Sequence, residues 1–244
     1  MRTPTAQLMR RVGVVHANDR FRYATNFPLR VGIALQDGDT YNTYWRLFGT
    51  NMTSALSTFA AGGGITLTTA GASADNARIY PQRLQVPTVA KSPGFYTRVK
   101  TGASVQDTQI VAGFYDALTP FGSFTTGGGS TLCRFAYDRA EFGNGNWWCN
   151  VIDSSASPAT REVFDTGVEV EASTTYELAI EVDANRLTRF SLRRKGHGWR
   201  HNQAQAKRVF TSTTASLYPY VGVQANAAAA KALTIRKLAY GMTE

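Results

Sequence analysis

Acidic residues are the first side chains to consider for catalysis, because two carboxyl groups at a defined separation can hydrolyse a glycosidic bond. In β-sandwich glucanases both groups come from one strand, in the pattern ExDxxE. Glu181-Val182-Asp183 begins this pattern, but Arg186 occupies the position of its second glutamate. Glu169-Val170-Glu171 likewise lacks a completing partner. The sequence therefore predicts no glycosidase site, and we expect the chain not to be an enzyme.

The residue spacings give little support for a metal-binding or phosphate-binding site. His197 and His201 are four positions apart and could chelate a metal on a helix, but Gly196 and Gly198 flank the first histidine and no carboxylate is nearby. Asp37-Gly38-Asp39 could hold Ca²⁺, but it is one short acidic turn, and Ca²⁺ takes roughly six to eight oxygen ligands. No nucleophile elbow, HExxH segment or phosphate loop occurs. We expect no metal and no cofactor.

The adjacent tryptophans Trp147 and Trp148 are the strongest binding feature of the sequence. Neighbouring residues of a strand point to opposite faces, so one ring is expected in the core and the other on the outer face. A tryptophan exposed beside Tyr137 or Phe142 could stack on a sugar ring or anchor a protein interface. The alternative is that loops of the same domain cover both rings.

The formal net charge of +9 is unevenly distributed along the chain. Residues 1–30 carry six arginines and one acid, residues 184–243 carry eleven basic residues and no acid, and residues 31–183 have a net charge of −6. Such segregation allows docking on a charged scaffold or on other copies of the chain, although a generally basic surface is the simpler alternative. Nucleic acid is a less favoured partner, because the basic residues alternate with apolar ones and form no basic block. The predicted partner-binding residues are Arg2, Arg10, Arg11, Arg20 and Arg22 near the N-terminus, and Arg193, Arg194, Lys195 and Arg200 in a basic rim.

The segment Thr175–Arg194 predicts a β-hairpin together with its register. Apolar and polar residues alternate through both halves, which is the period of a strand with one buried face. A three-residue loop at Ala184-Asn185-Arg186 sets the pairing, and a slip of one residue would place glutamate opposite phenylalanine. The four expected cross-strand pairs are Ile180 with Phe190, Leu178 with Leu192, Glu181 with Arg189, and Glu177 with Arg193.

Many further short strands, separated by glycine-rich turns, predict an all-β, two-sheet antiparallel sandwich. We expect one β-sandwich domain over residues 19–244, preceded by an N-terminal arm over residues 1–18. In the last strand, over Ala232–Tyr240, the apolar residues change phase, which predicts a bulge at Arg236-Lys237. A helical turn is expected at Ala227–Ala230, and a short strand at Arg208–Thr211.

Cys133 and Cys149 lie in strand-like segments without ligand-spaced partners, so we expect two reduced, buried thiols. No apolar run approaches the ~18 residues that a membrane-spanning helix needs. The N-terminal residues contain several arginines and no apolar core, unlike a secretory signal. Synthesis and assembly in a cytosol are therefore expected.

Several segments, taken in order, resemble the concanavalin A-like and laminin G-like jelly-roll proteins encoded among the structural genes of tailed bacteriophages. The segments are Asn18–Phe21, residues 62–81 (GGGITLTTAGASADNARIYP), 94–100 (GFYTRVK), 109–116 (QIVAGFYD), 175–196 (TYELAIEVDANRLTRFSLRRKG) and 217–241 (LYPYVGVQANAAAAKALTIRKLAYG). The resemblance covers roughly residues 18–241. Arg194-Lys195-Gly196 departs from the usual polar turn after the second hairpin strand, which makes that loop unusually basic.

The resemblance implies a virion protein, most often a decoration or cement protein that binds the outer capsid surface and stabilises the shell. Its partners would be the major capsid protein and neighbouring copies of itself, in a dimer or trimer. Two alternatives stay open. One is a receptor-binding or glycan-binding, lectin-like module of a tail or fibre, and the other is a principal coat protein whose basic arm contacts the genome.

Overall fold

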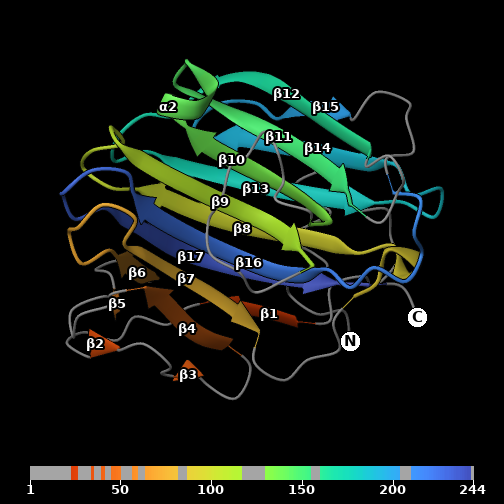
Figure 1. The fold of residues 1–244 in the computed structure, drawn as a ribbon, viewed down its shortest axis with the longest axis horizontal. Helices are drawn as coiled ribbons and strands as arrows, with labels where there is room; N and C mark the ends of the chain where they lie inside the picture. Colours follow the sequence, from red (N-terminus) through yellow and green to blue (C-terminus); the bar gives the residue numbers. More distant parts are fainter. Residues whose placement is uncertain are drawn as a thin grey trace.

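Two antiparallel β-sheets pack face to face around a hydrophobic core in the part of the chain that the structure describes (Figure 1). The structure is a computed structural model, and it describes residues 23–26, 34–35, 40–41, 45–50, 57–59, 64–81, 87–116, 130–154, 160–203 and 210–242. The view in Figure 1 passes through both layers, so strands of the two sheets overlap in projection. The predicted all-β sandwich is confirmed.

One layer, sheet A, contains nine strands among these described residues. In spatial order they are β15 (Arg200–Gln203), β14 (Thr188–Arg194), β13 (Thr175–Val182), β8 (Gly94–Thr101), β17 (Ala232–Gly241), β6 (Ile65–Thr68), β5 (Ser57–Phe59) and β2 (Ala34–Leu35), with β1 (Tyr23–Asn26) also paired to β17. Strands that are far apart in sequence are neighbours in this sheet, since β8 pairs with β17.

The other layer, sheet B, has eight strands in the same set of described residues. In order they are β12 (Thr160–Glu169), β11 (Asn146–Asp153), β10 (Leu132–Asp138), β9 (Thr108–Tyr115), β16 (Tyr218–Ala225), β7 (Asn76–Pro81), β4 (Trp45–Thr50) and β3 (Thr40–Tyr41). Two short helical segments, η1 (Val89–Lys91) and α2 (Arg139–Phe142), lie between strands. No helix of the described residues is long and apolar enough to cross a membrane.

Aromatic side chains fill much of the space between the sheets. Trp147 is fully buried, and its ring meets those of Phe135, Tyr137 and Tyr176 edge to face at centroid distances of 6.4, 6.4 and 5.6 Å. Edge-to-face packing is favourable because the positive ring edge meets the negative ring face. These contacts join β10 and β11 of sheet B to β13 of sheet A, so Trp147 links the two layers.

Both cysteines are buried in the core and unpaired, as the sequence predicted. They lie on neighbouring strands, where Phe135 is the register partner of Cys149 and Val151 that of Cys133. Burial raises the pKa of both thiols, so they stay protonated at neutral pH.

The predicted hairpin register is confirmed at every pair. Ile180 pairs with Phe190, Leu178 with Leu192, Glu181 with Arg189, and Glu177 with Arg193. The Asp183 side chain accepts hydrogen bonds from the backbone N–H groups of Asn185 and Leu187, at 2.8 and 2.9 Å. Asp183 therefore stabilises the turn. This structural role explains why the sequence contains only part of the ExDxxE pattern.

The bulge in the last strand is also confirmed, because the register of β17 against β8 shifts between Ile235 and Lys237. The helical turn predicted at Ala227–Ala230 is wrong: residues 226–229 form a bend. The reason is a set of competing bonds, since the Asn226 backbone N–H donates to the Asp107 carbonyl oxygen at 2.8 Å and its side chain donates to Asp138 at 3.2 Å.

Three other local differences concern short elements. Arg200–Gln203, for which the sequence predicted no strand, forms edge strand β15 beside β14. Of the strand predicted at Arg208–Thr211, Phe210 and Thr211 lie in no strand, and residues 208–209 are outside the described ranges. Helix α2 was not predicted, although Asp138 caps it by accepting from the N–H groups of Ala140 and Glu141.

Candidate functional site on the outer face of sheet B

Sheet B has two buried or partly buried faces with different compositions. Along β9, Ile110, Ala112 and Phe114 belong to the core between the sheets. Val111 points the other way and packs with Ala136 in a second cluster, against which Phe142 and Tyr220 are partly buried. An antiparallel sheet that only separated core from water would carry mainly polar residues on this face. The outer face of sheet B is therefore a candidate binding surface.

An arginine lies between two tyrosines near the middle of this face. The Arg134 side chain is 4% exposed, and its Nη1 donates to the Tyr220 hydroxyl at 3.1 Å. Its guanidinium carbon is 5.6 Å from the centre of the Tyr115 ring, and the Tyr115 and Tyr220 rings meet edge to face at 5.9 Å. Burial raises the pKa of Tyr220, so the hydroxyl keeps its proton and can donate a hydrogen bond while accepting one from Arg134.

A second arginine lies towards the other side of the same face. The Arg78 guanidinium is 4.5 Å from the centre of the Phe48 ring, and Phe48 meets Tyr80 edge to face at 6.3 Å. Arg78 and Tyr80 come from β7, whereas Phe48 comes from the neighbouring β4. A guanidinium over an aromatic face is held by cation–π attraction.

Trp148 lies on the β11 side of the face, opposite to Trp147 as the strand alternation predicted. Its ring is partly exposed and stacks on Phe142 with a centroid distance of 4.6 Å and an interplanar angle of 9°. The indole N–H donates to Asn144 Oδ1 at 2.9 Å, and the amide of Asn144 donates to Asp165 at 2.8 Å. Of the two neighbours considered for Trp148, Phe142 is confirmed, whereas Tyr137 packs in the core against Trp147.

We call this surface the aromatic face; it consists of Phe48, Arg78, Tyr80, Tyr115, Arg134, Phe142, Trp148 and Tyr220. Tyr115, Phe142, Trp148 and Tyr220 are partly exposed, so their rings can pack on the C–H groups of a sugar, whereas Arg78, Tyr80 and Arg134 are buried within the face. A few placed polar groups among aromatic side chains are typical of ligand sites.

The outer face of sheet A has a different character. Thr66 and Thr234 share a hydrogen bond of 2.9 Å between their hydroxyls. Glu177 is 4% exposed and forms ion pairs with Arg98 at 3.3 Å and Arg193 at 2.8 Å. These side chains bond to one another across the strands, which is the usual covering of a solvent-facing sheet.

The predicted basic rim gathers around the turn between β14 and β15. Lys195 and Arg200 are exposed, Arg194 pairs with Glu171, and Arg193 is held by Glu177 with its guanidinium 4.8 Å from the centre of the Trp199 ring. The structure therefore brings the four rim residues together, although the two central arginines have carboxylate partners. Arg2, Arg10, Arg11, Arg20 and Arg22, like the acidic turn at 37–39, lie outside the described residues.

Acidic side chains do not form a metal cage in the described part of the chain, where no group of three or more His, Cys, Asp or Glu residues could hold an ion. Glu169 is the last residue of β12, and Glu171 follows two positions later. Glu171 forms an ion pair with Arg194.

Sequence reasoning identified Trp148 and Phe142 but missed most of the aromatic face. Arg134 and Tyr220 are 86 positions apart and meet only because β10, β9 and β16 are neighbours in sheet B. One local signal was available, since Asp138 and Glu141 have the spacing of a capping box and predict the turn that presents Phe142.

No protein-family model and no curated protein matches the chain. Among solved structures, it is similar to a protein of unknown function from Shewanella oneidensis MR-1, with a TM-score of 0.58 and 12% identity over 99% of this chain and 95% of that one. It is also similar to an endo-β-1,4-glucuronan lyase from the fungus Trichoderma reesei (TM-score 0.57, 10% identity, 91% and 96% covered). Peanut lectin gives a TM-score of 0.57 and 12% identity over the same shares of each chain. At these identities the comparisons show the fold alone: the chain is a jelly-roll sandwich of the concanavalin A-like type.

Proposed function

We propose that the protein is a non-catalytic, lectin-like module that binds a glycan on its aromatic face. The observation that carries this proposal is the set of partly exposed rings on the outer face of sheet B, where Trp148 stacks on Phe142 and Tyr115 meets Tyr220 edge to face. Solved proteins of the same fold include a lectin and an enzyme named for a polysaccharide substrate, which supports a saccharide ligand. In a phage particle, such a module would belong to a tail or fibre.

Replacing Trp148 with alanine is expected to weaken glycan binding strongly while the fold is retained. The substitution removes the ring that stacks on Phe142 and the N–H that holds Asn144. Loss of an aromatic anchor commonly costs about 2 kcal/mol or more, which corresponds to a Kd that is weaker by about thirtyfold or more. Binding of the wild type to a glycan array, followed by titration of the best ligand, provides the measurement.

Trp199→Ala is the matched control, because Trp199 is a partly buried tryptophan on the sheet A side, against Arg193. It should bind the selected glycan as the wild type does. Equal loss in both variants, or unchanged binding by Trp148→Ala, would exclude the aromatic face as the glycan site.

The second candidate is the capsid decoration protein implied by the sequence resemblance. A specific observation favours it: Lys195 and Arg200 are exposed at the β14–β15 turn, beside Arg194, on one edge of the sandwich. Such an edge could contact acidic capsid subunits, and many copies would multiply weak contacts. In this role the protein would lie on the outer shell, beside copies of itself.

A rebinding experiment tests this candidate. Purified protein is expected to bind expanded tailed-phage capsids at low salt, to raise their disruption temperature, and to dissociate as salt screens the charges. The double variant Lys195→Gln, Arg200→Gln should bind more weakly, with Arg189→Gln as a control on the opposite strand end. Failure of the wild type to bind at low salt would count against the candidate.

A further inference from the structure

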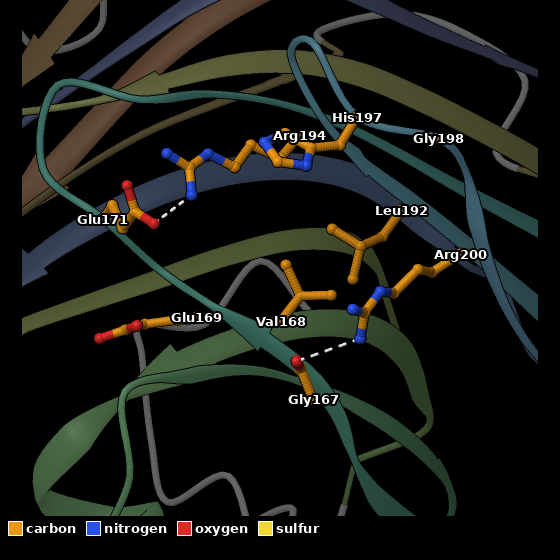
Figure 2. Close-up of a pocket in the computed structure, with 9 residues that line it drawn as sticks. All are labelled: Gly167, Val168, Glu169, Glu171, Leu192, Arg194, His197, Gly198 and Arg200. Carbon is orange, nitrogen blue, oxygen red and sulfur yellow. Dashed lines mark hydrogen bonds and ion pairs between the residues drawn. The ribbon is translucent and has the colours of Figure 1, made fainter.

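A pocket of about 260 Å³ opens where edge strands of the two sheets meet (Figure 2), and none of its lining residues belongs to the aromatic face. Strand β12 of sheet B supplies one wall, and β14, β15 and their connecting turn supply the other. Val168 and Leu192 lie between the walls, and Leu192 is 1% exposed. The pocket therefore has an apolar floor, and Figure 2 shows charged groups around it.

The conformation of β12 helps to form this pocket. Its register against β11 shifts between Asn146 and Trp148, and Gly167 has a φ of +65° within the irregular segment. The Gly167 N–H donates to Asp165 at 2.7 Å, which holds the bulge in place. As a result, the Gly167 carbonyl oxygen points towards β15 and accepts a hydrogen bond of 3.3 Å from Arg200 Nη1.

Arg200 and His197 lie beside this floor, and neither forms an ion pair within the part of the chain that the structure describes. Arg200 is exposed, and its hydrogen bond is the long one to Gly167, whereas a guanidinium has five N–H donors. His197 is exposed on the opposite lip, held by a turn in which its backbone N–H donates to the Arg194 carbonyl oxygen at 3.0 Å. The Arg194–Glu171 ion pair closes a third side and is neutral as a unit.

The charges are therefore unevenly placed within the pocket. Glu169 extends away from Arg200 in Figure 2, with Val168 between the two. An anionic group above Val168 and Leu192 would meet Arg200 directly and would avoid both glutamates. Arginine favours planar anions, because its fork of donors matches both oxygens of a carboxylate.

We propose that this pocket binds a carboxylate carried on a short aliphatic stem. Arg200 holds the two carboxylate oxygens, His197 covers the site from the opposite lip, and the stem packs on Val168 and Leu192. The carboxylate comes either from an acidic side chain of a partner protein or from a small organic acid, since both present the same group. The proposal is independent of glycan binding on the aromatic face.

Titration with glutarate tests the proposal, followed by amide chemical shifts in NMR spectra of the ¹⁵N-labelled full chain. Saturable shifts are expected at Gly167, Val168 and Gly198, and glutaramide, which has the same stem but no charge, should bind at least about tenfold more weakly. Arg200→Gln should weaken glutarate binding by a similar factor, because the amide can still bond Gly167 but cannot pair with a carboxylate. Arg189→Gln is the matched control, since Arg189 is exposed on β14 but lies outside the pocket.

A second titration, with the blocked peptide Ac-Ala-Glu-Ala-NH₂, distinguishes the two sources of the carboxylate. Binding comparable to that of glutarate supports an acidic side chain of a partner, and binding of glutarate alone supports a small organic acid. Equal affinity for glutaramide, unchanged binding by Arg200→Gln, or saturating shifts elsewhere with none at these amides would overturn the proposal. Unchanged amide shifts in the remaining strands show that the variants are folded.

Discussion

Trp147→Ala is expected to destabilise the protein by about 3–5 kcal/mol, the usual range for removing a fully buried tryptophan. The ring is buried completely and packs edge to face against Phe135, Tyr137 and Tyr176 from both sheets. Its removal would leave a cavity between the layers that the flanking strands cannot close, because each is fixed by pairing on both sides. Domains have about 5–15 kcal/mol of stability in total, so a large part would be lost. Urea unfolding followed by tryptophan fluorescence and circular dichroism gives the free energy.

The adjacent Trp148 provides an internal comparison for this effect. Trp148→Ala removes a partly exposed ring from the outer face and should reduce stability by about 1 kcal/mol. Trp147→Phe should recover part of the loss by refilling the cavity. Equal destabilisation by the two alanine variants would contradict the assignment of one ring to the core and the other to the aromatic face.

Gly113→Ala is expected to destabilise the protein by about 3 kcal/mol or more. Gly113 has a φ of +153°, and a Cβ there would lie 2.5 Å from the Cys133 carbonyl oxygen, 2.6 Å from Arg134 Cα and 2.8 Å from Ile180 Cδ1. Two of these contacts are with the backbone of β10, which cannot rotate away. Strained backbone costs about 1–3 kcal/mol, and overpacking adds about 1–3 kcal/mol. Thermal unfolding should show the change as a lowered Tm.

Gly143→Ala separates the two causes. Gly143 has a φ of +73° at the end of α2, but a Cβ there would meet nothing within 4 Å. It should cost only about 1 kcal/mol, from backbone conformation alone. If the two variants lost equal stability, close packing at Gly113 would not be the cause.

The sequence predicted the hairpin register because all of its determinants are local. Alternation along two adjacent segments and a short turn are enough to set Ile180 opposite Phe190. The bulge in β17 was predictable for the same reason, since the change of phase lies within one strand. Non-local bonding explains the error at residues 226–229, because Asn226 bonds to Asp107 and Asp138, both of which are distant in sequence.

The aromatic face was not predictable because it depends on which strands become neighbours. Arg134 and Arg78 each sit in a strand of mixed polarity and resemble ordinary surface arginines in sequence. Their environment is set by rings from other strands, Tyr115 and Tyr220 around Arg134 and Phe48 beside Arg78. The pocket was not predictable for the same reason, since its floor residues Val168 and Leu192 belong to different sheets.

The inaccessibility of the two native thiols has a practical consequence for spectroscopy. Cys133 and Cys149 are the chain's two cysteines, and burial leaves both protonated and shielded from reagents. A cysteine introduced on the surface would therefore react first with a maleimide dye or nitroxide, without prior removal of the native pair. Placed beside either proposed binding surface, such a label would report ligand occupancy directly, in a protein whose interior is otherwise unmodified.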